Sequence, residues 1–168
     1  MMTEAKLVRP ATPEDYDQIL KLNEESVHFL SPLSKEKLIH LHQQSEILKV
    51  VEVDGVVEAF VLALSEGKDY DSVNYIWFEK NYEKFLYIDR VVVSLKQQSS
   101  GLGKLLYDEV FKHAESVGTP VVTAEIDIEP PNPVSLKFHE KFGFQEVGQQ
   151  AVAGGKNIVS LQAVKVDS

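Results

Sequence analysis

The chain has 168 residues, 43% of them hydrophobic and 26% charged, which is the composition of a globular protein with a substantial core. Its formal net charge of −9 argues against general attraction to a polyanion such as nucleic acid. The absence of cysteine excludes disulfides, thiolate nucleophiles and cysteine-based zinc sites.

No stretch reaches the roughly 18 uninterrupted apolar residues of a membrane-spanning helix. The first ten residues also lack the basic and apolar layout of a secretory signal. We therefore expect one domain over residues 1–168, located in the cytoplasm, with neither nucleic acid nor a membrane as a partner.

The first part of the sequence predicts one strand followed by two helices. Residues 6–12 form the strand, and Thr12 caps a helix over 12–26 because a proline and acidic residues follow it. A second helix within 31–44 begins after Ser34 and has its leucines on one face.

A β-hairpin is predicted over residues 46–65, because two β-rich runs flank the dipeptide Asp54-Gly55. The next segment, 66–85, has no clean hydrophobic period and combines aromatic with acidic residues. A connection of this length in a compact domain is usually functional or disordered. Its aromatic content favours an ordered segment.

The second half predicts alternating strands and helices. A helix over 102–117 has one apolar face and ends at Gly118. The other predicted elements are the strands 85–93, 121–128, 144–152 and 157–166 and the short helix 132–142. The resulting order, β-α-α-β-β-β-α-β-α-β-β, is that of an α/β fold.

A glycine-containing loop, "QQSSGLGK" at 97–104, joins the strand 85–93 to the helix that follows. It is not a Walker A loop, because Gln98 stands where that motif needs glycine and Leu105 where it needs Ser or Thr. It is not a dinucleotide fingerprint either, because Leu106 replaces the third glycine.

The pattern that the loop does satisfy is Gln/Arg-x-x-Gly-x-Gly/Ala. Small residues at a helix start let successive backbone N–H groups point at an anion, which the helix dipole also attracts. The alternative is a loop that only turns the chain. The motif consists of Gln98, Ser99, Ser100, Gly101, Leu102 and Gly103.

Together with its surroundings, this loop resembles that of the GNAT superfamily of acyl-CoA-dependent N-acyltransferases. In that family a valine ends the strand five residues before the Gln/Arg, as Val93 does here. Downstream, the segment 132–144 resembles the family signature Asn-x-x-Ala/Ser-x-x-Phe-Tyr-x-x-x-Gly-Phe through Asn132, Ser135, Phe138, Gly143 and Phe144. The resemblance implies a mixed, mostly antiparallel sheet. Its element order covers the chain, and its specific motifs lie within 85–144.

The resemblance further implies an acyltransferase that uses acetyl-CoA as co-substrate and needs no metal. A primary amine of a small molecule or peptide would attack the thioester directly. The residues implied to bind acetyl-CoA are Val91, Val92, Val93, Gln98, Ser99, Ser100, Gly101, Leu102, Gly103, Lys104, Asn132, Ser135 and Phe138. For Lys104 the alternative is a solvated surface lysine, and for Asn132 it is a helix cap.

Three residues are candidates for proton transfer. The family commonly has tyrosine where this sequence has His139, and that tyrosine can protonate the departing thiolate, as an imidazole also can. An attacking amine must lose a proton, for which Glu125, on the same strand face as Asp127, and Asp89, inside an apolar strand, are the candidate carboxylates. The alternatives are a surface histidine, a solvated strand edge, and an Asp89 paired with arginine or a backbone donor.

The acceptor site is predicted in the first two helices and in the segment 66–85. Aromatic residues among acids suit a cationic amine, although they also suit an exposed sheet edge or a homodimer contact. The predicted substrate residues are His28, Phe29, Tyr75, Trp77 and Tyr87.

Two other functions stay open at this point. The first is a GNAT-fold module that binds acyl-CoA as a sensor or regulator without turnover, because the family tyrosine is missing. The second is a partner-binding domain whose loop is only structural. The sequence leaves the acceptor, the acyl length and the oligomeric state undefined.

Overall fold

A computed structural model describes residues 5–26, 32–98, 100–129 and 131–166. In chain order the strands and α-helices are β1 (Lys6–Pro10), α1 (Tyr16–Glu25), α2 (Lys35–Gln44), β2 (Ile47–Val53), β3 (Val56–Ser65), α3 (Val73–Asn81), β4 (Leu86–Val93), α4 (Leu102–Val117), β5 (Val121–Glu129), α5 (Pro133–Lys141), β6 (Gln145–Val152) and β7 (Asn157–Lys165). Short 3₁₀ turns also occur at Pro13–Asp15, Leu95–Gln97 and Ala153–Gly155.

The strands follow the order β1-β2-β3-β4-β5-β7-β6. Pairing is antiparallel for β1–β2, β2–β3, β5–β7 and β6–β7, and parallel for β4–β5. The predicted α/β fold with a mostly antiparallel sheet is therefore confirmed. The structure adds one helix, α3, which lies inside the segment 66–85 that the sequence left without a secondary structure.

The chain forms two compact units. The first consists of Met1–Leu64 and Arg90–Lys112, and the second of Ser65–Asp89 and His113–Ser168. The strand β4 and the helix α4 each pass from one unit into the other.

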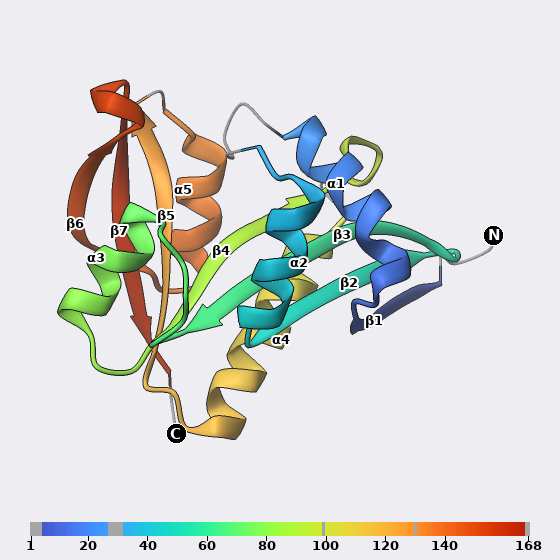
Figure 1. The fold of residues 1–168 in the computed structure, drawn as a ribbon, viewed down its shortest axis with the longest axis horizontal. Coiled ribbons are helices and arrows are strands. Elements are labelled where there is room, and N and C mark those ends of the chain that lie inside the picture. Colours follow the sequence, from blue (N-terminus) through green and yellow to red (C-terminus); the bar gives the residue numbers. More distant parts are fainter. Residues whose placement is uncertain (1–4, 27–31, 99, 130, 167–168) are drawn as a thin grey trace. The chain divides into compact units, whose positions relative to one another are not determined.

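In the first unit, the hairpin β2–β3 turns at Asp54 and Gly55, whose φ angles of 51° and 85° belong to the left-handed region. Such a turn matches the twist of the strands that it joins. β3 is buried over most of its length, and Figure 1 draws α1 and α2 in front of β2 and β3 and the first turns of α4 behind them. Leucines and isoleucines of α1 and α2 supply apolar contacts to this core.

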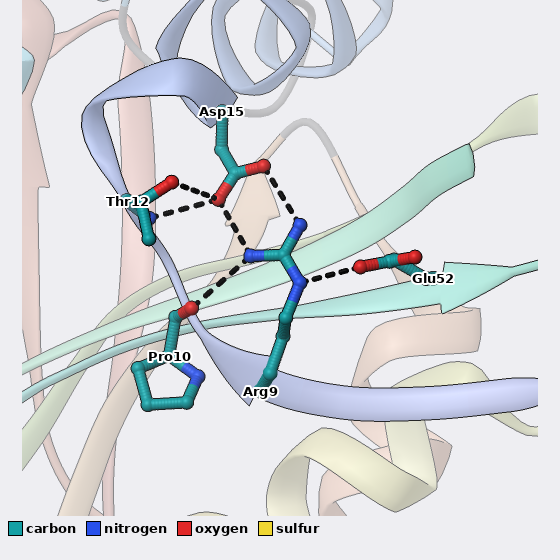
Figure 2. A network of polar contacts seen from close by, with 5 residues as sticks. All are labelled: Arg9, Pro10, Thr12, Asp15 and Glu52. Atoms are coloured by element: carbon teal, nitrogen blue, oxygen red, sulfur yellow. Dashed lines mark hydrogen bonds and ion pairs between the residues drawn. The ribbon is translucent and has the colours of Figure 1, made fainter. Parts of the chain in front are cut away.

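A polar network fixes the start of α1 to the strands of the first unit (Figure 2). Arg9 binds both carboxylate oxygens of Asp15, at 2.7 and 2.9 Å, and its Nε donates to Glu52. The backbone N–H of Thr12 donates to Asp15 at 2.8 Å, so Thr12 and Asp15 together begin the helix as the sequence predicted for Thr12. The arginine lowers the pKa of the Asp15 carboxyl by hydrogen bonding to its ionised form.

In the second unit, α3 packs on β6. A Cβ added to Gly148 in β6 would lie 2.7 Å from Cζ2 of Trp77, so the indole rests directly on the strand backbone. Gln150 of β6 also donates to the side chain of Asn74 at 3.0 Å. Figure 1 accordingly draws α3 beside β6 and β7.

Tyr75 and Phe78 of α3 form a buried aromatic cluster with Phe85 and Tyr87. The ring of Tyr75 is 5.7 Å from both Phe85 and Tyr87, in edge-to-face geometry. These contacts explain why the segment 66–85 is ordered, as its aromatic content predicted. Across the described residues, no helix is both long and apolar enough to span a membrane.

Candidate functional site

The glycine-containing loop lies in the first unit and is held by its own polar groups. The side chain of Gln98 donates to the Val93 carbonyl at 3.0 Å, which joins the loop to the end of β4. The hydroxyl and the N–H of Ser100 both donate to the Gln97 carbonyl. Gln97 in turn donates to Glu58 at 3.2 Å. The loop is therefore pre-formed on either side of Ser99, which itself lies outside the described residues.

The first turn of α4 presents backbone donors. The first intrahelical bond runs from the N–H of Leu105 to the carbonyl of Gly101, at 3.1 Å. The N–H groups of Leu102, Gly103 and Lys104 precede that bond and have no carbonyl four residues back within the helix. At the positive end of a 16-residue helix, this arrangement suits an anion.

Gly101 gives the loop its shape and leaves room beside it. Its φ of 85° lies in the left-handed region, where other residues are strained, and an added Cβ would meet no atom within 4 Å. A phosphate could therefore approach the backbone at Gly101 without a steric clash.

Two lysines lie at the loop. Lys6 of β1 donates to the Ser100 carbonyl at 3.1 Å, a contact that the sequence did not predict because the two residues are 94 positions apart. Lys104 forms an exposed ion pair with Asp108 at 3.0 Å, one turn further along α4. Of the predicted strand residues, Val92 is buried, whereas Val91 and Val93 are half-buried.

The second unit contains a polar cluster on β4 and β5. Asp89 is buried and accepts a hydrogen bond from the hydroxyl of Tyr70 at 2.5 Å. Tyr87 and Thr123 are register partners in the two parallel strands. Within the described residues, the hydroxyl of the fully buried Tyr87 has no hydrogen-bond partner. Burial raises its pKa well above the usual value, and the charges of Glu125 and Asp89 raise it further.

Asp127 lies two residues beyond Glu125 and therefore on the same face of β5. It is half-buried, and burial raises its pKa above that of an ordinary aspartate. The sequence identified this carboxylate beside Glu125 but gave no reason to select it, because burial depends on the packed structure.

The helix α5 begins at Asn132, whose side chain accepts from the N–H of Ser135 at 3.3 Å, which is the cap that the sequence offered as an alternative. His139 is buried on this helix, with ring contacts to Phe138 and Phe144. Its Nδ1 lies 2.7 Å from the Ser135 carbonyl oxygen and must therefore carry a proton. Burial lowers its pKa, so the imidazole is neutral and its Nε2 is a proton acceptor.

The predicted substrate residues have different surroundings. Tyr75 is fully buried; its hydroxyl donates to the Ser65 carbonyl at 2.7 Å and accepts from the Lys68 N–H at 2.9 Å. Burial raises its pKa to about 12. Trp77 packs on Gly148, and Tyr87 belongs to the β4–β5 cluster. His28 and Phe29 lie outside the described residues.

Comparisons with known proteins agree with this architecture. A curated relative, phosphinothricin N-acetyltransferase of Streptomyces viridochromogenes, is 32% identical over 108 residues, which are 64% of this chain and only about half, 52%, of that protein. Ard1 from Thermoplasma volcanium superposes with a TM-score of 0.80 at 16% identity, covering 98% of this chain and 99% of Ard1. The yncA protein of Salmonella typhimurium, solved with its cofactor acetyl-CoA, gives 0.73 at 19% identity, covering 97% of this chain and 95% of yncA.

The two structural likenesses show the fold. The sequence assigns the family, because the model of the acetyltransferase (GNAT) family matches residues 14–144, well over half of the chain. The protein therefore belongs to the acetyltransferase (GNAT) family.

Proposed function

We propose that this protein is an N-acetyltransferase that moves an acetyl group from acetyl-CoA to a primary amine of a small molecule or peptide. The observation that carries the proposal is the first turn of α4, where three backbone N–H groups follow an open, left-handed Gly101. Family membership and a relative that is itself an N-acetyltransferase support the same conclusion.

In this proposal the loop Gln98–Lys104 binds the CoA pyrophosphate through backbone N–H groups. Lys6 adds a positive charge at Ser100, where the net charge of −9 would otherwise oppose an anion. The backbone of Val91–Val93 pairs with the pantetheine arm, as an added strand would. Asn132, Ser135 and Phe138 stay predicted cofactor contacts.

The amine nitrogen attacks the thioester carbonyl carbon, the C–S bond breaks, and CoA leaves as its thiolate. The proton of the acceptor passes to a carboxylate, for which we propose Asp127 with Glu125 beside it. A general base works best when its pKa is near the working pH, and burial moves the pKa of Asp127 in that direction. His139 is a neutral acceptor in this environment, so we do not assign protonation of the thiolate to it.

We also propose that the two compact units belong to one domain, because the family match takes residues from both. The cytoplasmic location and a homodimer stay predictions from the sequence.

The test is release of CoA thiol from acetyl-CoA across a panel of amino acids, polyamines, aminoglycosides and peptides with free amino termini. We expect at least one amine to raise thiol release well above the rate with acetyl-CoA alone, and mass spectrometry should find that amine acetylated. Binding of acetyl-CoA without turnover on any amine would instead support the sensor function. A protein that binds no acetyl-CoA would refute both.

A further inference from the structure

Tyr70 lies in the segment that connects β3 to α3 and contacts a carboxylate on a different element. Its hydroxyl donates to Oδ1 of Asp89, in β4, at 2.5 Å. Tyr70 is half-buried and Asp89 is only 9% exposed, so little water competes for this bond. An O–H···O⁻ bond of this length is typical of a charge-assisted hydrogen bond, which is among the stronger kinds in proteins.

The neighbouring helix holds Tyr70 in place. Tyr75 of α3 pins the preceding segment by bonding to both the Ser65 carbonyl and the Lys68 N–H, and its ring lies 5.6 Å from that of Tyr70. The N–H of Tyr70 donates to the Lys68 carbonyl at 3.0 Å. Glu79 of α3 accepts from the Gly67 N–H at 2.9 Å. The position of Tyr70 is thus fixed by contacts that centre on the buried Tyr75.

The groups that face this part of the cluster come from three elements: Tyr70 from the segment before α3, Tyr87 from β4 and Glu125 from β5. Asp89 and Glu125 both act electrostatically on the buried Tyr87 hydroxyl. The hydrogen bond that Tyr70 donates restricts the orientation of the Asp89 carboxylate.

We propose that Tyr70 is a positioning residue for Asp89, holding this carboxylate oriented to receive the ammonium group of the acceptor before transfer. The inference rests on the proposed acetyltransferase function and gives its acceptor a chemical class, an amine that arrives protonated. It also gives α3 a structural role in the site, because α3 fixes the segment that carries Tyr70.

The experiment compares Tyr70→Phe, Asp89→Asn and the double variant with the wild type, using the best acceptor of the amine panel. Tyr82→Phe is the matched control, because Tyr82 caps the other end of α3 and its ring packs on Phe78. We expect Tyr70→Phe to lower kcat/KM for the acceptor about tenfold or more, mainly through KM, and to leave KM for acetyl-CoA within about twofold.

The kinetic constants of the two substrates separate positioning from simple packing. A general packing defect would affect both substrates, whereas loss of the bond that orients Asp89 should raise KM for the acceptor alone. In the Asp89→Asn background, Tyr70→Phe should have no further effect, since the group that it positions is gone. Tyr82→Phe should behave as the wild type.

An unchanged KM for the acceptor in Tyr70→Phe, or full additivity of the two changes, would overturn the proposal. If the wild type acetylates no amine, the proposed function fails and the role of Tyr70 in it fails too. The hydrogen bond can still be tested without turnover, because the ¹³C NMR chemical shift of the Asp89 carboxyl responds to the loss of a hydrogen-bond donor. An Asp89 carboxyl shift that is equal in wild type and Tyr70→Phe would show that the bond does not hold the carboxylate.

Discussion

At the scale of single residues, His139 shows how surroundings decide chemistry. In the sequence it occupies the place of a family tyrosine, and the acid role of that tyrosine would require a protonated imidazole here. In the structure it is buried among phenylalanines and uses Nδ1–H on the Ser135 carbonyl. Burial favours the neutral form, which accepts a proton and does not supply one.

This protonation state predicts a pH dependence of stability. An unfolded histidine takes up a proton near pH 6.5, whereas folded His139 resists it. Below that pH the unfolded chain therefore binds more protons, and the free energy of unfolding falls as the pH drops. Between pH 7.5 and pH 5 the wild type should lose more stability than His139→Phe, by at most about 1.4 kcal/mol per pH unit.

Urea unfolding at a series of pH values measures this difference, and only the slopes with pH are compared, so a constant packing change in the variant does not matter. Identical slopes in the two proteins would mean that His139 titrates normally when folded. His40→Phe, on α2, provides a reference for removal of a half-buried histidine.

The tyrosines of the segment 66–85 show what residue type alone can and cannot predict. The sequence showed that aromatic residues gather in 66–85, and the structure orders that segment around them. It could not show that Tyr75 uses its hydroxyl on the Ser65 carbonyl while Tyr70 uses its own on Asp89. The first bond joins residues 10 positions apart in the sequence, and the second joins residues 19 positions apart. No local pattern in the sequence predicts either pairing.

At the scale of elements, the hairpin and the helix α4 were predicted best, because residues within each element determine its conformation. Asp54-Gly55 makes its hairpin because both residues adopt positive φ, and α4 occupies the predicted range, with Gly118 at a φ of 75° just after it. The helix α3 has no such signal. Its buried residues Asn74, Tyr75 and Phe78 include a polar side chain that binds Gln150, so no simple apolar stripe appears in the sequence.

The contact of α3 with β6 predicts that Gly148 does not tolerate a side chain. In Gly148→Ala, the new Cβ would lie 2.7 Å from Cζ2 and 3.1 Å from Cη2 of Trp77, and a rigid indole must move to relieve that overlap. We expect a loss of about 1 to 3 kcal/mol in the free energy of unfolding, which denaturant titration measures.

A second background separates this overlap from other effects of alanine in a strand. Replacing Trp77 with leucine removes the ring atoms that the Cβ would meet, so Gly148→Ala should be nearly neutral in Trp77→Leu, within about 0.5 kcal/mol. A full penalty in that background would show that Trp77 is not the obstacle.

At the scale of the whole molecule, the net charge of −9 sets the conditions for binding a polyphosphate. A polyphosphate would need a local site that overcomes this unfavourable average field. The first turn of α4, with Lys6 and Lys104, is the site that we propose. The sequence located the loop because its glycine spacing is local. It did not reveal Lys6, which reaches the loop only when β1 takes its place beside β2.

Family membership follows from the sequence match over 14–144, and the donor follows as a proposal from the loop. The predicted acceptor site draws on side chains from several elements, and two of its predicted residues, His28 and Phe29, lie outside the described part of the chain. Neither motif spacing nor the fold selects it, because the same fold is shared with Ard1 at only 16% identity.

Calorimetric titration of acetyl-CoA tests whether the loop before α4 binds this co-substrate, as we propose. Gly101→Glu places a negative side chain at the open, left-handed position of the loop, while Gly118→Glu makes the same change at the other end of α4, where φ is 75° and the space is equally open. We expect a wild-type Kd between about 1 µM and 1 mM, at least a tenfold weaker Kd in Gly101→Glu, and a value within about twofold of wild type in Gly118→Glu. Equal affinity in wild type and Gly101→Glu, or no binding by the wild type, would contradict the proposal.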